Sequence, residues 1–145
     1  MTDSNQPAYP ALTTDATVRI LIVDDDEDDR FLCQQALTGL VPTHWAGYAE
    51  GAEQAVAYLR TCARLPDLLI TDLNMPGMPG DELTGQVRQA AGWRHLPVVV
   101  WSSSASPADR RRCYETGANA YLVKPHRHEH IADLLRMFIR IWLAG

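Results

Sequence analysis

Lysine is almost absent from this chain, since Lys124 is the only lysine and the other 12 of the 13 basic residues are arginine. Basic residues are also outnumbered by 18 acidic ones, so the formal net charge is −5. Because a protein that binds a phosphate backbone needs a basic surface, this balance argues against a nucleic-acid partner. With 145 residues, 46% of them hydrophobic, the chain is long enough for one domain with a sizeable core and too short for two.

Cysteine is scarce as well, and long hydrophobic runs are missing. Cys33, Cys62 and Cys113 are widely spaced and form no CxxC pair, which indicates reduced thiols rather than a disulfide framework. No apolar run approaches the roughly 20 residues of a membrane span, and the N-terminus lacks the segments of a secretory signal. We therefore expect a cytoplasmic protein with no membrane partner, in which residues 1–17 form a disordered tail before a single domain over residues 18–145.

Beyond that tail, short apolar runs rich in β-branched residues are separated by segments of helical length. Such runs are typical of strands buried on both faces of a parallel sheet. Strands are predicted over Arg19–Val23, Asp67–Thr71, Pro97–Trp101 and Ala120–Val123, with a weaker candidate nearer the sheet edge over His44–Tyr48. Helices are predicted over Asp28–Leu40, Ala52–Arg64, Asp81–Ala90, Pro107–Thr116 and His128–Leu143. Five β-α repeats with right-handed crossovers predict an α/β fold, a five-stranded parallel sheet in a doubly wound, flavodoxin-like αβα sandwich.

Polar side chains stand where four of these strands end. They are, in chain order, Asp24 to Asp26, Asp72, Ser102 and Lys124. Because the carboxyl ends of parallel strands meet at one edge of the sheet, we expect these groups to converge on one pocket. Neighbouring carboxylates repel each other unless a cation relieves them, and Mg²⁺ prefers carboxylates together with water and phosphate oxygens. Since a carboxylate is also a nucleophile toward phosphorus, the pocket suits reversible phosphorylation of an aspartate.

Four motifs in this order, ILIVDDDEDD, LLITDLNMPGMPG, VVVWSS and YLVKP, resemble the receiver domain of bacterial two-component response regulators, as in the chemotaxis regulators. The resemblance covers residues 18–143. It implies a phosphoacceptor switch, not a turnover enzyme, that takes a phosphoryl group from a sensor histidine kinase with Mg²⁺ or Mn²⁺ as cofactor. The ending in WL is similar to that of single-domain regulators that accompany bacterial phytochrome kinases, which makes a bacteriophytochrome a candidate partner.

The resemblance also implies roles for residues around the acidic motif. Asp72 matches the phosphoacceptor, and Asp25 matches the direct metal ligand of the acidic pair. Asp24 matches its partner, which acts on the metal through water. Asn74 matches the position whose backbone carbonyl binds the metal.

Three further positions match the part of the family that contacts the phosphoryl group and responds to it. Ser102 matches the switch hydroxyl, and Lys124 matches the lysine that contacts the phosphoryl group. Tyr121 matches the aromatic switch position, although a tyrosine on a strand is equally well explained as a packing residue.

Two alternatives to this reading remain. A phosphatase of the haloacid-dehalogenase type would use Asp24 and Asp26 of the DxD pattern as nucleophile and acid/base, although position 28 does not carry its usual residue. A scaffold that works without phosphorylation would not need every pocket group. The acids from Asp26 to Asp29 are themselves interpreted as a charge cluster at a helix N-terminus rather than as site residues.

Some residues depart from the commonest pattern of the family. Pro79 stands where a polar residue is usual, Trp101 is bulky next to the switch hydroxyl, and His126 replaces a frequent aromatic. His126 and His130 would share a helix face, but without further ligands a solvated helix start is a better interpretation than a zinc site.

The last predicted helix carries more apolar residues than one buried face needs. The stripe expected to pack on the sheet consists of Ile131, Leu134, Leu135, Phe138 and Trp142, and the excess consists of Met137, Ile139, Ile141 and Leu143. We therefore expect a homodimer through this helix, the alternative being a long helix that wraps its own domain. No output domain follows the predicted receiver in the sequence, so the output is expected to reach an unidentified downstream protein through protein contacts.

Overall fold

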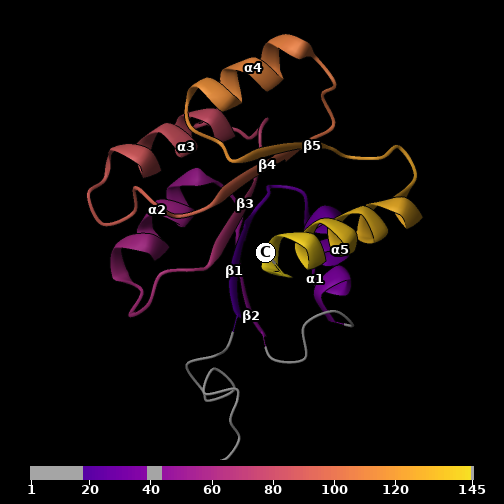
Figure 1. Ribbon diagram of the computed structural model, residues 1–145, viewed down its shortest axis with the longest axis horizontal. Helices are drawn as coiled ribbons and strands as arrows, with labels where there is room; N and C mark the ends of the chain where they lie inside the picture. Colours follow the sequence, from indigo (N-terminus) through magenta and orange to yellow (C-terminus); the bar gives the residue numbers. More distant parts are fainter. Residues whose placement is uncertain (1–17, 39–43, 145) are drawn as a thin grey trace, which may run out of the picture.

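A computed structural model describes residues 18–38 and 44–144, in which helices and strands alternate (Figure 1). The elements are β1 Val18–Val23, α1 Glu27–Thr38, β2 His44–Ala49, α2 Ala52–Thr61, β3 Leu68–Asp72, α3 Gly80–Gln89, β4 Val98–Ser102, α4 Pro107–Glu115, β5 Ala120–Val123 and α5 His128–Ala144. The tail expected over residues 1–17 lies outside the described residues. Within the described ranges, no helix is long and apolar enough to cross a membrane.

The five strands form one parallel sheet in the order β2-β1-β3-β4-β5. This order confirms the predicted doubly wound fold and puts the weakest predicted strand, β2, at an edge. Helix α2 ends at Thr61 rather than at the predicted Arg64, because the backbone becomes extended at Cys62. The predicted end of the first helix at Leu40 lies outside the described residues.

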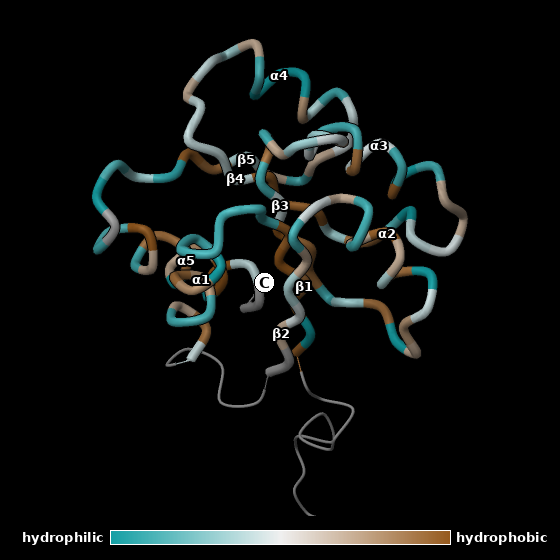
Figure 2. The backbone as a smooth tube through the Cα atoms, turned by 180° about the vertical axis from the view of Figure 1, so that it is seen from behind, coloured by the Kyte–Doolittle hydropathy of each residue, from teal (hydrophilic) through white to brown (hydrophobic). Residues whose placement is uncertain are grey.

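Each central strand sends alternate side chains to opposite faces of the sheet. In β1, Ile20 and Ile22 pack against α1 and α5, whereas Leu21 and Val23 pack against α2 and α3. A third buried cluster lies beneath α4 and includes Val100 and Cys113. Figure 1 shows the resulting layers, with α1 and α5 on one side of the sheet and α2, α3 and α4 on the other, and Figure 2 shows hydrophobic residues concentrated along the strands between them.

Helix α5 packs on the sheet through the predicted residues except one, because Ile139 takes the place of Leu134. Ile131, Leu135 and Ile139 are buried, whereas Leu134 is only partly buried. Residues four apart lie almost above one another on a helix, so Ile139 continues the buried line while Leu134 is turned away from it. Met137 and Ile141 are 54% and 67% exposed, which confirms the apolar excess on this helix.

The carboxyl ends of the inner strands lie side by side at one edge of the sheet. Val23 of β1 pairs with Thr71 of β3, Asp72 pairs with Trp101 of β4, and Ser102 follows Trp101 in the chain. Polar groups that are far apart in the sequence therefore come together beyond these ends.

Candidate functional site

Three aspartates meet at this edge of the sheet. Asp24 follows β1, Asp72 ends β3, and a carboxylate oxygen from each lies within 4.8 Å of the others and of one from Asp25. Asp24 and Asp72 are buried, whereas Asp25 is exposed. Among the residues that the structure describes, this is the one group of three or more side chains close enough to hold a metal ion together.

Lys124, which follows β5, brings a positive charge into this acidic group. Its Nζ donates hydrogen bonds to Asp29 Oδ2 at 2.7 Å and to Asp24 Oδ2 at 3.0 Å, and it lies 3.6 Å from Asp72 Oδ1. The same ammonium stands 4.9 Å from the centre of the Trp101 ring. The side chain of Lys124 is only 9% exposed, so these contacts are shielded from solvent.

Burial and charge shift the pKa values of these groups. Burial raises the pKa of Asp72 to about 6, with Lys124 opposing the shift and Asp24 adding to it. Burial likewise raises the pKa of Asp24 against the effect of Lys124. Burial opposes the charge on Lys124, but the carboxylates of Asp24, Asp29 and Asp72 outweigh it and raise the pKa of Lys124. Above pH 6 the site therefore holds an ionised Asp72 next to a charged lysine.

A cavity of about 400 Å³ opens onto these groups. Asp25, Asp72, Lys124 and His126 are among the residues that line it. Its four acidic lining residues, Asp25, Asp26, Asp29 and Asp72, face a single lysine, so the cavity is suited to a cation or to a cation with a phosphate group.

The loop after β3 holds Asp72 in place. The backbone N–H of Leu73 donates to Asp72 Oδ1 at 2.8 Å, and the N–H of Gly80 donates to the Leu73 carbonyl at 2.8 Å. A Cβ at position 80 would collide with the carbonyl oxygen of Asp72, so only glycine allows the chain to pass this close. The carboxylate thus has one oxygen fixed by the backbone.

The loop after β4 links Ser102 to Tyr121. Ser102 Oγ accepts a hydrogen bond from the Ser104 N–H at 3.1 Å, and the Tyr121 hydroxyl donates to the Ser104 carbonyl at 2.8 Å. Ser104 Oγ donates to Asp109 at 2.6 Å at the start of α4. Tyr121 is buried beneath α4, so it both packs and makes a specific hydrogen bond.

The structure also places the remaining residues that the sequence singled out. Asn74 is exposed on the loop after Asp72, and Pro79 directly precedes α3. Trp101 is fully buried among the residues that pack against α1 and α5. His126 and His130 are exposed, and α5 begins at His128 as predicted, so the two histidines do not share a helix face.

Asp29 was missed by the sequence reasoning. Of the acids interpreted as a helix N-terminal cluster, Asp26 does cap α1, because its Oδ1 accepts from the N–H groups of Asp28 and Asp29 at 2.8 and 3.2 Å. The side chain of Asp29, however, binds Lys124. Asp25 precedes α1, which begins at Glu27, so no helical spacing in the sequence relates Asp29 to the other pocket acids.

Residues 20–136 match the response regulator receiver domain family. The chain belongs to this family. A receiver domain is the phosphoacceptor of two-component signalling, and the match leaves the haloacid-dehalogenase alternative without support.

Two relatives show that similar receivers occur in proteins of different length. The chain is 36% identical over 121 residues to the sensory/regulatory protein RpfC of Xanthomonas campestris pv. campestris (strain 8004), a match that covers 82% of this chain and 16% of RpfC. It is 30% identical over 129 residues to the probable methanogenesis regulatory protein FilR2 of Methanothrix harundinacea (strain 6Ac), covering 86% of this chain and 83% of FilR2. The receiver thus spans a small part of RpfC and most of FilR2.

Solved structures of similar receivers share the fold closely. The phosphorylated cyanobacterial phytochrome response regulator RcpA has a TM-score of 0.83 at 28% identity, over 88% of this chain and 94% of RcpA. The Mn²⁺-bound form of response regulator Rcp1 has a TM-score of 0.80 at 27% identity, over 87% of this chain and 94% of Rcp1.

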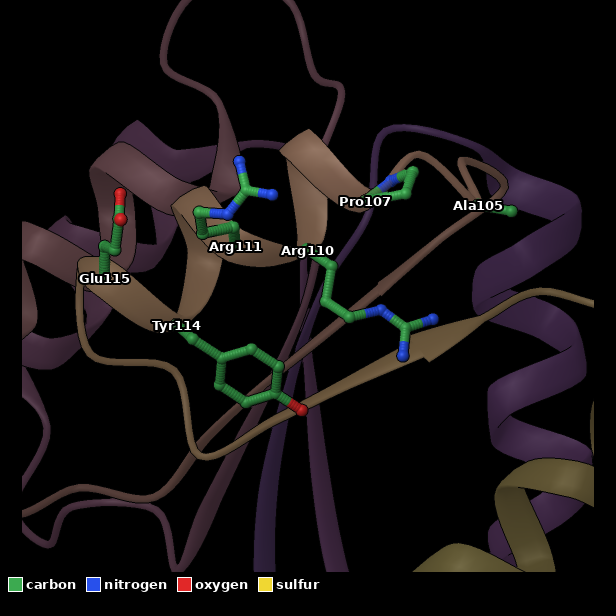
Figure 3. Close-up of a pocket in the computed structure, with 6 residues that line it drawn as sticks. All are labelled: Ala105, Pro107, Arg110, Arg111, Tyr114 and Glu115. Carbon is green, nitrogen blue, oxygen red and sulfur yellow. The ribbon is translucent and has the colours of Figure 1, made fainter.

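A second, larger cavity of this receiver lies on α4, away from the acidic group. It measures about 640 Å³ and is lined by residues of α4 and the loop before it, Ala105, Pro107, Arg110, Arg111, Tyr114 and Glu115. Figure 3 shows Arg110 and Tyr114 pointing toward β5 and Arg111 pointing the other way. The Tyr114 hydroxyl accepts a hydrogen bond from the Tyr121 N–H at 3.0 Å. The lining of this cavity is thus hydrogen-bonded to β5, the strand that carries the buried Tyr121.

Proposed function

We propose that this protein is a response regulator that accepts a phosphoryl group from a sensor histidine kinase on Asp72. The observation that carries the proposal is the meeting of three aspartate side chains within 4.8 Å beside the ammonium of Lys124. This group unites a nucleophile, a set of metal ligands and a phosphate-binding cation in one small cavity.

The residues at the site fit a divalent cation of the Mg²⁺ type. Asp25, Asp72 and the backbone carbonyl of Asn74 would hold it, and Asp24 would act through water. The fit rests on chemistry, because the donors are carboxylate oxygens, which hard cations prefer, and because acids outnumber the one lysine. The Mn²⁺-bound form of Rcp1, a receiver of similar fold, supports the assignment. When bound, the cation supplies positive charge that offsets the negative charge of the phosphoryl oxygens.

In the transfer, a carboxylate oxygen of Asp72 attacks the phosphorus of a phosphohistidine. The new O–P bond forms as the P–N bond breaks, and the imidazole leaves with the electron pair. Since Oδ1 is held by the Leu73 N–H, we infer that Oδ2 is the attacking oxygen. Lys124 and the hydroxyl of Ser102 bind the transferred phosphoryl oxygens.

The response starts when Ser102 turns toward the phosphoryl group. Its Oγ then gives up the hydrogen bond from the Ser104 N–H, which loosens the loop that Ser104 ties to Asp109 and to Tyr121. The change reaches α4 and β5, the elements around the larger cavity, and this surface is where we expect the downstream protein to bind.

Two further assignments concern partners. The similarity to RcpA, described as a phytochrome response regulator, favours a bacteriophytochrome as the kinase. The exposed Met137 and Ile141 on α5 favour a homodimer through that helix. Sedimentation at micromolar concentration should show a dimer that Ile141→Glu dissociates, and a wild-type monomer both with and without beryllofluoride contradicts the dimer.

Labelling with radioactive acetyl phosphate and Mg²⁺ tests the proposed function. The wild-type protein should take up one label, and Asp72→Asn should take up none, because an amide cannot act as the nucleophile. Asp133→Asn is the matched control, since Asp133 is 71% exposed on α5, and it should label like the wild type. Undiminished labelling of Asp72→Asn overturns the assignment. Transfer from a panel of phosphorylated kinases then identifies the partner.

A further inference from the structure

We propose that Asp29 is a positioning residue for phosphoryl transfer, which fixes the ammonium of Lys124 from the α1 side so that it stands beside Asp72 without a hydrogen bond to it. This inference rests on the proposed function. The observation behind it is the order of the three distances from Nζ, which are 2.7 Å to Asp29, 3.0 Å to Asp24 and 3.6 Å to Asp72.

The ammonium of Lys124 has three N–H donors, and Asp24 and Asp29 take two of them. The distance to Asp72 is too long for a good hydrogen bond, so the third donor remains available for an incoming phosphoryl oxygen. Charge-assisted hydrogen bonds are strong where solvent is excluded, and the side chains of Lys124 and Asp29 are only 9% and 16% exposed. The two carboxylates therefore hold the ammonium firmly.

Asp29 is itself well fixed. It lies in the first turn of α1, and its backbone N–H donates to the capping Asp26 Oδ1 at 3.2 Å. The positive end of the helix dipole favours a carboxylate at this position. Asp24 and Asp29 thus approach Lys124 from two different elements, the end of β1 and the start of α1.

Without Asp29, two of the three carboxylate partners of Lys124 would remain, Asp24 and Asp72. The ammonium would then move toward Asp72, and the 3.6 Å ion pair would shorten to a direct hydrogen bond. Such a pair occupies the nucleophile and competes with the divalent cation for the same carboxylate. Asp29 therefore keeps Asp72 available while leaving the lysine close enough to reach the phosphoryl group.

The scarcity of lysine makes the contact directly observable. Because Lys124 is the only lysine of the chain, protein grown with ¹⁵N-lysine gives a single side-chain ammonium signal in an NMR spectrum recorded without any metal. We expect Asp29→Asn to shift this signal and to speed its hydrogen exchange by about tenfold, as expected when one of two charged hydrogen bonds is lost. Asp28→Asn, an identical change at an exposed neighbour on the same turn, should leave the signal unchanged.

Phosphorylation by acetyl phosphate at saturating Mg²⁺ provides the second readout. Asp29→Asn should react about tenfold more slowly than the wild type, and Asp28→Asn within about twofold of it. In a Lys124→Met background, Asp29→Asn should cause no further slowing, because the two residues act through one contact. If circular dichroism shows that Asp29→Asn is unfolded, Asp29→Ser takes its place.

An equal slowing in both backgrounds, or an unchanged ammonium signal, overturns the positioning role. If the wild type takes up no label at all, the proposed function fails instead, and the ammonium signal still decides whether Asp29 holds Lys124.

Discussion

Two cations in this receiver each bind more than one carboxylate, but in opposite surroundings. Lys124, 9% exposed, is surrounded by Asp24, Asp29 and Asp72 at the ends of the strands. Arg112 of α4, 47% exposed, lies 2.9 Å from Asp81 of α3 and 3.2 Å from Asp109 of its own helix. The first group faces a cavity, and the second joins two helices.

The aspartates in the two groups respond differently. Burial raises the pKa of Asp72, whereas a hydrogen bond from Ser104, helped by Arg112, lowers the pKa of Asp109. At the strand ends the loss of solvent outweighs the nearby lysine, and at the surface the hydrogen bonds outweigh a small loss of solvent. The ionised form of a carboxylate next to a cation is therefore favoured only where water or enough hydrogen bonds remain. At the strand ends, one lysine does not balance the negative charge of the aspartates.

The largest expected difference between the two cations is in phosphorylation. Lys124→Met should slow labelling by acetyl phosphate by about 100-fold, because it removes the buried positive charge that the proposed mechanism assigns to the phosphoryl oxygens. Arg112→Met should stay within about threefold of the wild type, since Arg112 only joins α3 to α4. Rates of label uptake at fixed Mg²⁺ measure both. Equal losses in the two variants would mean that Lys124 has no special role.

A second prediction concerns Gly80, which follows the loop after Asp72 and directly precedes Asp81. Gly80→Ala should lower the free energy of unfolding by about 2–4 kcal/mol, since its Cβ collides with the Asp72 backbone. Gly85→Ala, in the same helix but with open space around it, should raise the free energy of unfolding by about 0.5–1 kcal/mol. Urea denaturation measures both, and a neutral Gly80→Ala contradicts the close approach.

The pH dependence of stability separates the two groups further. The folded pKa of Asp72, about 6, lies above its ordinary value of 3.8, so ionising Asp72 disfavours the folded state above pH 6. Without metal, Asp72→Asn should raise the free energy of unfolding at pH 7.5 by up to about 3 kcal/mol. This gain should shrink as the pH falls through 6 and vanish only well below 3.8, where both states bind the proton.

The matched variant is Asp81→Asn, which removes a partner of Arg112. It should lower the free energy of unfolding instead of raising it. Denaturant titrations across the pH range check both variants, and a destabilised Asp72→Asn at pH 7.5 contradicts the comparison.

The smallest expected effect is the response to Mg²⁺. Adding 10 mM Mg²⁺ should raise the free energy of unfolding of the wild type by about 1 kcal/mol, as mass action predicts for a site of millimolar affinity. Asp25→Asn should abolish this gain, and Asp81→Asn should keep it. Thermal melts with and without EDTA measure the difference. A gain that persists in Asp25→Asn would mean that Asp25 is not a ligand of the metal.

Much of the fold was predictable because its signals are local. The apolar runs at residues 19–23 and 97–101 have no alternation, so they identify strands with two buried faces, and the structure differs from them by one residue at most at each end. Asp24, Asp72 and Lys124 were predicted to converge because parallel strands share one carboxyl edge, and they do so.

Other features depended on the way whole elements pack. The burial of Ile139 in place of Leu134 follows from the rotation of α5 about its own axis, which a hydrophobic stripe with several good registers does not specify. The contact between Asp29 and Lys124 joins residues 95 positions apart, so no local pattern reveals it.

The sequence by itself determined which chemical groups this receiver has at its strand ends: an acidic motif, a hydroxyl and a single lysine. Only the tertiary structure decided how that lysine is shared among the carboxylates and which of them is left with a pKa near 6. The reason is physical. The type and order of residues are local properties, whereas burial and the distances between charges, on which electrostatic energies depend, exist only once β1, α1, β3 and β5 are packed together.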